Sequence, residues 1–451
     1  MSPRVILWAV LRAGPAGAVR RAGFFHTAGR LRKGESLKRK PLFYGYIVAF
    51  SSILVMFAVW GLGNHPLSLY VVPLTEQYGF SRAAFSLVFS IINLFTAFGN
   101  LLFGTLDRKV GIKKLMLLGA ILCVGAYALF YFGGGLVVFY IAAALFGISI
   151  AFTTNNPLSV LVNNWFLERR GFILGLIFAA SGLGGTVGDV VVGRLQAIMP
   201  YQAALGVTAC AIAVLLAVAL VLLRETPASM GLSPYGTAAA AAAAADADGL
   251  PFSQAVHCPS FWLLLLTEVL WGISIIPVMT CIPAYLSDRG FADAYVSGVV
   301  MASLYGISAV AKLSMGMVSD RWGPGAMVGI LSAAATAGML LLVFVQGELS
   351  ALGISLCIGI AFSCMTVPAP LLTSHIFGKK AFSALLGVFT ASLTFAGAAA
   401  TPLVNLVYDV SGSYIPAFLF QAAAFLLSGI TGVLAVRLRP RSPQHAGTPS
   451  Q

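Results

Sequence analysis

The recurrence of long apolar segments constrains this chain more than any other feature. Its 451 residues contain twelve stretches of about 20 mostly apolar residues, each long enough to cross a bilayer as a helix. Only 9% of the residues are charged, whereas a soluble domain carries roughly a quarter. This composition excludes a soluble globular enzyme, a disulfide scaffold and a disordered chain, and it predicts an all-α membrane protein. We place the predicted spans at 43–64, 84–106, 113–133, 136–161, 170–193, 201–223, 260–286, 295–318, 325–346, 350–374, 381–406 and 414–436.

Positive charge is distributed unevenly between the two sides of these spans. With a cytoplasmic N-terminus, twenty-three of the 27 Lys and Arg residues fall in cytoplasmic segments, and three fall outside, at Arg82, Arg194 and Arg289. The remaining base, Lys312, lies inside a span. Because basic residues gather on the cytoplasmic side of membrane proteins, we expect both termini in the cytoplasm and the protein in the cell membrane.

The first 40 residues form a basic tail with ten Lys and Arg residues and a single acid, Glu35. Because the tail precedes an apolar span, we expect anionic lipid headgroups as its partner in preference to nucleic acid. A transit segment and an upstream, misassigned start are the alternatives that this composition leaves open.

The two halves of the chain repeat each other. Gly104 opens the segment GTLDRKVG twenty-five residues after Gly79, and Gly316 opens GMVSDRWG twenty-six residues after Gly290. Parallel repeats of six helices are a transporter architecture, in which the substrate lies near the membrane midplane between the halves. We therefore divide the chain into a basic tail (1–40), a first six-helix bundle (41–224), a cytoplasmic linker (225–259), a second six-helix bundle (260–437) and a C-terminal tail (438–451).

The segment GMVSDRWG (316–323) fits G-x-x-x-D-R-x-G, a loop signature of the major facilitator superfamily. The first-half copy departs from it, because Asp107 and Arg108 stand one position early. The chain thus resembles that superfamily, which implies twelve helices in two pseudo-symmetric halves, a monomer, and loops that latch the cytoplasmic gate. Physically, a carboxylate in such a loop can meet the N-terminus of a neighbouring helix. The candidate gating residues are Gly104, Asp107, Arg108, Arg169, Arg170, Asp189, Gly316, Asp320 and Arg321.

A narrower resemblance lies in WFLERRGFILGLIFAASG (165–182), which is similar to the entry of span 5 in monocarboxylate transporters and oxalate:formate antiporters. It implies a secondary active transporter that moves small organic anions by alternating access, as a proton symporter or an anion antiporter. A carrier for a drug or an amino acid, and a sensor without flux, are the alternatives. We find no Walker loop, paired catalytic carboxylates or metal-ligand spacing, so we expect no enzyme activity, no cofactor and no metal.

Three charged residues lie inside predicted spans, where charge is costly and usually functional. Glu268 and Lys312 fall near mid-membrane on consecutive helices, whereas Asp189 falls near the outer surface, where it can gate or pair with Arg194. We expect Lys312 to bind the substrate carboxylate and Glu268 to carry the coupled proton. The alternatives are that Lys312 only neutralises Glu268, or that it reaches back to the cytoplasmic surface.

The resemblance also bears on Lys312, because monocarboxylate transporters have an arginine at the matching place. The oxalate carrier has a second buried base in span 11, and this chain has none between Phe382 and Asp409. One cation matches one carboxylate, so a monocarboxylate is favoured over oxalate.

Polar and helix-breaking residues supply the remaining candidates. Tyr70, Asn155 and Asn156 are expected to line the substrate site, and Asn64, His65 and Tyr285 to lie near its outer entrance. Because prolines interrupt helices and expose backbone groups, we expect breaks in span 4 at Asn155, Asn156 and Pro157, in span 7 at Pro277 and Pro283, and in span 10 at Pro368 and Pro370. Kinks whose freed backbone groups are satisfied locally are the alternative. We assign the glycines at 171, 175, 184 and 188 to close helix packing.

Overall fold

The computed structural model describes residues 43–80, 82–237, 249–291 and 296–440. Within these ranges the long elements are all helices, and twelve of them are long and apolar enough to cross a membrane. The predicted fold class is therefore confirmed, and the protein is an integral multi-pass membrane protein. Helices prevail because a lipid core offers no partner for a backbone N–H or C=O group, so each segment must satisfy these groups internally. The predictions for the tails fall on residues outside the described ranges.

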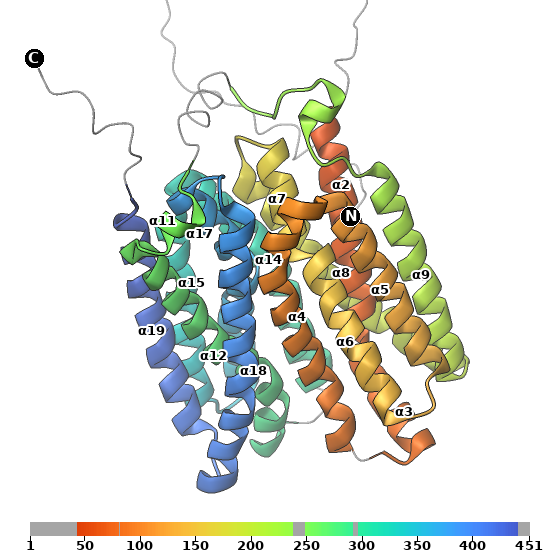
Figure 1. Cartoon of the computed structure of the whole chain (residues 1–451). Helices are drawn as coiled ribbons and strands as arrows, with labels where there is room; N and C mark the ends of the chain where they lie inside the picture. The colour runs from red at the N-terminus through yellow and green to blue at the C-terminus, as the bar shows by residue number, and fades with distance from the viewer. Residues whose placement is uncertain (1–42, 81, 238–248, 292–295, 441–451) are drawn as a thin grey trace, which may run out of the picture. The chain divides into compact units, whose positions relative to one another are not determined.

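The first half begins with a helix that changes type along its length. The α-helix α2 (Tyr44–Met56) continues as a π-helix (Phe57–Asn64) and a short 3₁₀ helix (Pro66–Tyr70). Span 4 is broken at Thr154, as predicted, because α6 ends at Thr153 and α7 begins at Asn155. The other helices of this half are α3 (Val71–Tyr78), α4 (Arg82–Val110), α5 (Ile112–Phe132), α6 (Leu136–Thr153), α7 (Asn155–Trp165), α8 (Arg170–Ile198) and α9 (Tyr201–Leu222) (Figure 1).

The second half repeats this arrangement, with its own break in the fourth helix. Span 10 divides into α16 (Glu348–Ala361), a 3₁₀ turn (Phe362–Met365) and α17, which starts at Pro368. The helices of this half are α12 (Pro259–Asp288), a π-helix (Val296–Met301), α14 (Ala302–Trp322), α15 (Pro324–Val343), α16, α17 (Pro368–Phe377), α18 (Phe382–Ser411) and α19 (Ile415–Arg437).

The predicted break in span 7 is wrong. Helix α12 runs without interruption from Pro259 to Asp288 and contains both Pro277 and Pro283. A proline inside a helix removes one hydrogen bond and favours a kink, but a transmembrane helix tolerates this because its neighbours and local adjustments satisfy the freed carbonyl.

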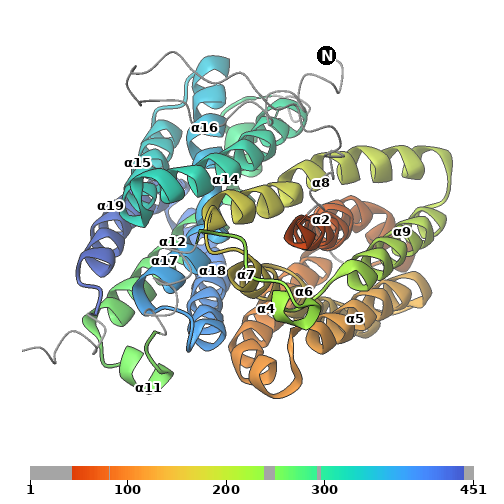
Figure 2. The ribbon, with the colours of Figure 1, turned by 90° about the horizontal axis from the view of Figure 1, so that it is seen from above.

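The two halves meet along two helix pairs, α8 with α14 and α4 with α18 (Figure 2). Glycine permits the close approach at both crossings. A Cβ atom added to Gly171 or Gly316 would collide with the backbone carbonyl of the other, and one added to Gly104 would collide with the backbone of Ala384. Gly175 packs in the same way against the carbonyl of Lys312. These contacts explain two of the four span-5 glycines; Gly184 and Gly188 pack on Gly61 of the first helix.

Asp320 joins the halves at the end of the bundle that carries the linker, which we call the linker end. Its carboxylate accepts hydrogen bonds of 2.8 Å from the backbone N–H groups of Gly171 and Phe172. These two groups open helix α8, where unsatisfied donors and the helix dipole favour a negative charge. A carboxylate from one half therefore caps a helix of the other.

Asp107 makes the related contact in the first half with fewer bonds. Its carboxylate accepts one hydrogen bond of 2.6 Å, from the Ser383 hydroxyl at the start of α18. The one-residue shift of Asp107 in the sequence thus accompanies a side-chain donor in place of two backbone donors. Among the other candidate gating residues, Arg170 donates to the carbonyl of Phe166 and Arg108 to that of Gly104, and Arg169 adopts a left-handed backbone conformation with φ of 56°.

The described parts of the linker are bound to loops of both halves. Tyr235 exchanges backbone hydrogen bonds with Trp165 and Leu167, and Leu250 donates to the carbonyl of Phe377. The backbone N–H and hydroxyl of Thr237 both donate to Glu168 and hold the pKa of that carboxyl below its usual range. The linker is thus attached next to the start of α8, where Asp320 also binds.

The difference between the two caps leads to a testable prediction. Asp320→Asn removes the charge and one of two hydrogen bonds, and a bond to a charged group contributes about 1.5–3 kcal/mol. We expect the linker end to open more often, by at least about tenfold, since each 1.4 kcal/mol is a factor of ten. In Asp107→Asn the amide oxygen still accepts from Ser383, so the change should be small. Double electron–electron resonance spectroscopy on spin labels at Lys114 and Arg437, with the six native cysteines replaced, would measure the open fraction. Equal open fractions in the two variants would contradict the prediction.

Candidate functional site

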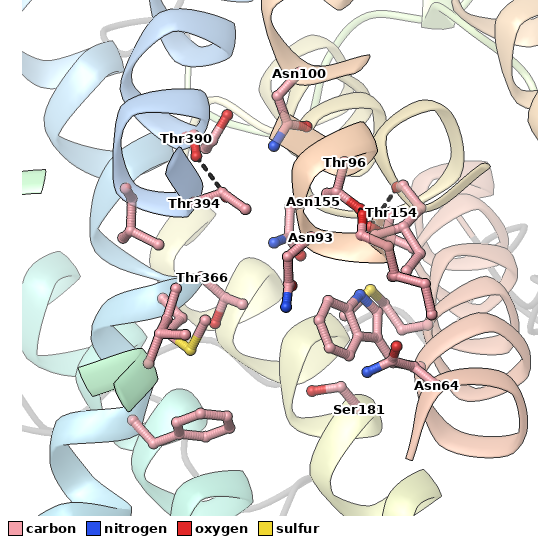
Figure 3. A pocket seen from close by; sticks show the side chains of 18 of the residues that line it. Asn64, Asn93, Thr96, Asn100, Thr154, Asn155, Ser181, Thr366, Thr390 and Thr394 are labelled. Atoms are coloured by element: carbon pink, nitrogen blue, oxygen red, sulfur yellow. Dashed lines mark hydrogen bonds between the residues drawn. The ribbon is translucent and has the colours of Figure 1, made fainter. Parts of the chain in front are cut away.

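A cavity lies between the two halves and is lined by residues from both (Figure 3). Its volume of about 70 Å³ leaves room for a few waters or a small solute, because a single water needs roughly 10–15 Å³. Its polar groups are mostly amides and hydroxyls. The lining comprises Met56, Trp60, Asn64, His65, Ile92, Asn93, Thr96, Asn100, Ile150, Thr154, Asn155 and Ser181 from the first half, and Ile276, Lys312, Phe362, Met365, Thr366, Thr390, Leu393 and Thr394 from the second.

Lys312 brings a positive charge to this cavity. Its side chain is 2% exposed, and its ammonium group donates a 2.8 Å hydrogen bond to the hydroxyl of Ser181 on α8. The same nitrogen lies 5.3 Å from the centre of the Phe362 ring, within the range of a cation–π contact. Within the described ranges it forms no ion pair with a carboxylate, so the cation lies in the cavity with only neutral neighbours.

Glu268 lies deeper in the second half and does not line the cavity. Its side chain has no exposed surface, and neither carboxylate oxygen has a hydrogen-bond partner in the part of the chain that the structure describes. Lys312 and Glu268 therefore do not form the ion pair that we considered as an alternative. The thiol of Cys364 is within electrostatic range of both Glu268 and Lys312.

Asn155 and Asn156 follow the break in span 4 and have different surroundings. Asn155 lines the cavity. The amide nitrogen of Asn156 lies 3.1 Å from the side-chain oxygen of Asn100 and 3.1 Å from the hydroxyl of Thr390. Asn156 and Asn100 belong to the first half and Thr390 to the second, so this buried polar triad joins the halves. The side chain of Asn156 is thus already hydrogen-bonded, and its two partners, Asn100 and Thr390, line the cavity.

Three other predicted residues lie away from the cavity lining. Tyr70 is fully buried, and its hydroxyl lies 3.4 Å from that of Thr208 on α9. Tyr285 donates to the carbonyl of Leu342 and packs within the second half. One carboxylate oxygen of Asp189 has no hydrogen-bond partner in the described residues. The structure therefore places neither tyrosine at the site, whereas Asn64 and His65 do line it.

Several cavity residues were not predicted from the sequence, although their spacing could have identified them. Asn93, Thr96 and Asn100 are spaced three and four apart, which places them on one face of α4, and all three line the cavity. Thr390 and Thr394 are four apart on α18 and do the same. The pattern that could have identified them is a row of polar residues, spaced as on one face of a helix, inside an otherwise apolar span. Nothing in the sequence identifies Ser181 as the partner of Lys312.

The described residues contain no group of three or more His, Cys, Asp and Glu side chains that could hold a metal ion. The groups that line the cavity are suited to recognising a solute. A cation, several amides and several hydroxyls surround a small space that residues of two separate bundles enclose.

The polar triad suggests a second test. Thr390→Val removes a buried hydrogen bond between the halves, and leaving a buried amide less satisfied costs about 1–3 kcal/mol. We expect a lower thermal unfolding midpoint. Thr394→Val is the matched control, because in the described chain the Thr394 hydroxyl bonds only to the carbonyl of Thr390 within its own helix. Purified variants in nanodiscs would be compared, and equal midpoints for the two variants would show that the triad does not hold the halves together.

Comparison with known proteins identifies the architecture. A family model described as Major Facilitator Superfamily matches residues 5–162 and 46–401. The chain is 24% identical to the uncharacterized transporter ESBP6 of Saccharomyces cerevisiae over 72% of this chain, and the match spans about half of that relative, 49% of its length. It is also 24% identical to the MFS-type transporter pytF of Aspergillus terreus, over 62% of this chain and 91% of that protein.

Solved structures agree at the level of the fold. The proton:xylose symporter XylE aligns with a TM-score of 0.68 and 14% identity, over 87% of this chain and 94% of that one. The fucose:proton symporter FucP of Escherichia coli aligns with a TM-score of 0.62 and 16% identity, over 88% of this chain and 100% of that one. The family match covers more than half of the sequence, and the chain therefore belongs to the major facilitator superfamily.

Proposed function

We propose that this protein is a secondary active carrier for small organic anions, with monocarboxylates as the favoured substrates. The observation that carries the proposal is Lys312, a buried cation that lines the cavity without a carboxylate partner in the described chain. A lysine inside the membrane is costly unless it is paired or wet. A substrate carboxylate entering the cavity supplies the missing negative charge, and this attraction favours anions over neutral solutes.

The rest of the cavity suits the remainder of such a substrate. Asn93 and Asn155 can donate hydrogen bonds to a second polar group, and Ile92, Ile276 and Leu393 offer apolar contact for a short carbon chain. Lysine presents a point charge and not the planar fork of arginine. One such charge matches one carboxylate, which favours a monocarboxylate over a dicarboxylate.

The contacts of Asp320 and Asp107 between the halves support a mechanism in which the cavity opens alternately to the two sides of the membrane. Both caps are formed here, so the structure corresponds to a state closed at the linker end. With both termini and the linker in the cytoplasm, as the charge distribution predicts, opening to the cytoplasm requires these caps and the triad at Asn156 to separate. Substrate release then follows the loss of the contacts between the halves.

Glu268 is the residue we assign to proton coupling. Burial without a partner disfavours the charged form of a carboxylate, so Glu268 is held neutral while Lys312 carries its charge. Binding of an anion neutralises the Lys312 charge and strengthens the hold of Glu268 on its proton. Departure of the anion restores the cation, which favours release of the proton. Substrate and proton therefore move together.

A neutral polyhydroxylated solute is the second candidate. The amides and hydroxyls of the cavity, with the Trp60 ring among its lining residues, are groups that also bind sugars, and the fold relatives XylE and FucP are described as symporters of xylose and fucose. Lys312 distinguishes the two candidates, because a neutral solute needs no buried cation.

The test of the substrate class is uptake by proteoliposomes. We expect accumulation of labelled lactate, pyruvate or formate, but not of xylose or fucose. Lys312→Gln should reduce anion uptake at least about tenfold, since removing a charged partner costs about 1.5–3 kcal/mol. Lys312→Arg should retain part of it because the charge remains. Normal anion uptake by a correctly inserted Lys312→Gln variant would remove Lys312 from the site, and uptake of only the sugars would support the second candidate.

The test of coupling uses the same vesicles with and without a pH gradient. Glu268→Gln mimics the protonated side chain, so we expect it to retain exchange of internal for external anion but to lose accumulation driven by the gradient. Gln421, a buried neutral residue of α19, offers a control in Gln421→Leu, which should keep both activities. Gradient-driven accumulation at the native rate in Glu268→Gln would contradict the proton role.

A further inference from the structure

We propose that the 3₁₀ turn of span 10, Phe362–Met365, together with Thr366, conducts protons between Glu268 and the cavity. This inference rests on the proton role proposed for Glu268. It addresses a physical difficulty that this role raises: Glu268 has no exposed surface and does not line the cavity, so its proton needs a path.

The turn lies between the two places that the path must connect. Phe362, Met365 and Thr366 line the cavity, and Figure 3 shows Thr366 there. Cys364 is 1% exposed, and its thiol is within electrostatic range of both Glu268 and Lys312. The turn also packs against α12, the helix that carries Glu268. One short segment therefore lines the cavity and also packs against the helix that carries the carboxyl group.

The hydroxyl groups of this segment are unusual for a transmembrane helix. A buried serine or threonine in a helix commonly bonds to the carbonyl four residues earlier, as Ser274 does with Leu270 in α12. The hydroxyls of Ser363 and Thr366 are buried and have no hydrogen-bond partner among the described residues. Because buried polar groups are normally satisfied by protein or by ordered water, water between these hydroxyls and Glu268 meets the needs of all three groups.

Such water and hydroxyl groups form a chain along which a proton can pass. The neutral carboxyl of Glu268 gives its proton to the adjacent water and becomes a carboxylate. Each member of the chain accepts one proton and passes one on, and the last water delivers the proton to the cavity beside Thr366. Only O–H bonds are broken and formed, and no electron is transferred. Cys364 in the turn, and Lys312 and His65 in the cavity lining, are the titratable groups beside this path in the described residues.

Infrared spectroscopy tests the path without a substrate. In purified protein in nanodiscs, the C=O stretching band of a neutral buried carboxyl should disappear in Glu268→Gln, which assigns the band. Transfer into D₂O shifts this band when the proton exchanges. We expect exchange to slow by about tenfold or more in Ser363→Ala/Thr366→Val, on the scale of one tenfold step per 1.36 kcal/mol of barrier.

Ser274→Ala is the matched control, because it removes a fully buried hydroxyl from α12 that already bonds within its own helix. It should exchange at the wild-type rate. A wild-type rate in the double variant, with circular dichroism and elution unchanged, would overturn the path, as would a spectrum without a Glu268 band. Failure of the proposed substrate would appear only in the uptake assays, so the two failures remain distinguishable.

Discussion

Backbone contact between the halves at glycine is the constraint on which the rest of the structure depends. Gly171 and Gly175 of α8 lie against the backbone of α14 at Gly316 and Lys312. Any larger side chain would separate these helices, and the consequences would reach both ends of the contact. At the linker end, Asp320 would no longer meet the two N–H groups that open α8. Deeper in the bundle, the ammonium group of Lys312 would lose the hydroxyl of Ser181, which lies on the same helix as the glycines.

The two halves contribute different chemistry to the cavity that this contact encloses. The first half contributes neutral amides and hydroxyls, such as Asn93, Thr96 and Asn155. The second half contributes the cation at Lys312 and, behind it, the carboxylate of Glu268. The cation and the carboxyl group on which the proposed mechanism depends therefore lie in one bundle, whereas the amide side chains that line the cavity lie in the other. A solute that needs both sets of contacts is held only while the halves are together.

The sequence predicted those features that follow from local rules. The twelve spans follow from segment length and apolar composition, and the break at Thr154 follows from the Asn155–Pro157 segment. The contact of Asp320 with a helix start was inferred from its charge and loop position. The side-chain partners were harder to predict, because they depend on how separate helices rotate about their axes. Lys312 and Glu268 were predicted near the same depth in the membrane, yet Lys312 contacts Ser181 across the interface and Glu268 is buried within its own bundle.

Three segments where regular helix structure is interrupted line the same cavity, and no local sequence pattern predicts this common location. The π-helix of the first span contributes Trp60 and Asn64 to the cavity, the break in span 4 contributes Thr154 and Asn155, and the turn of span 10 contributes Phe362, Met365 and Thr366. A membrane tolerates irregular backbone only where protein or water can satisfy it. Pro277 follows the cavity residue Ile276, yet α12 passes through it without a break. Proline alone therefore does not decide where a span is interrupted.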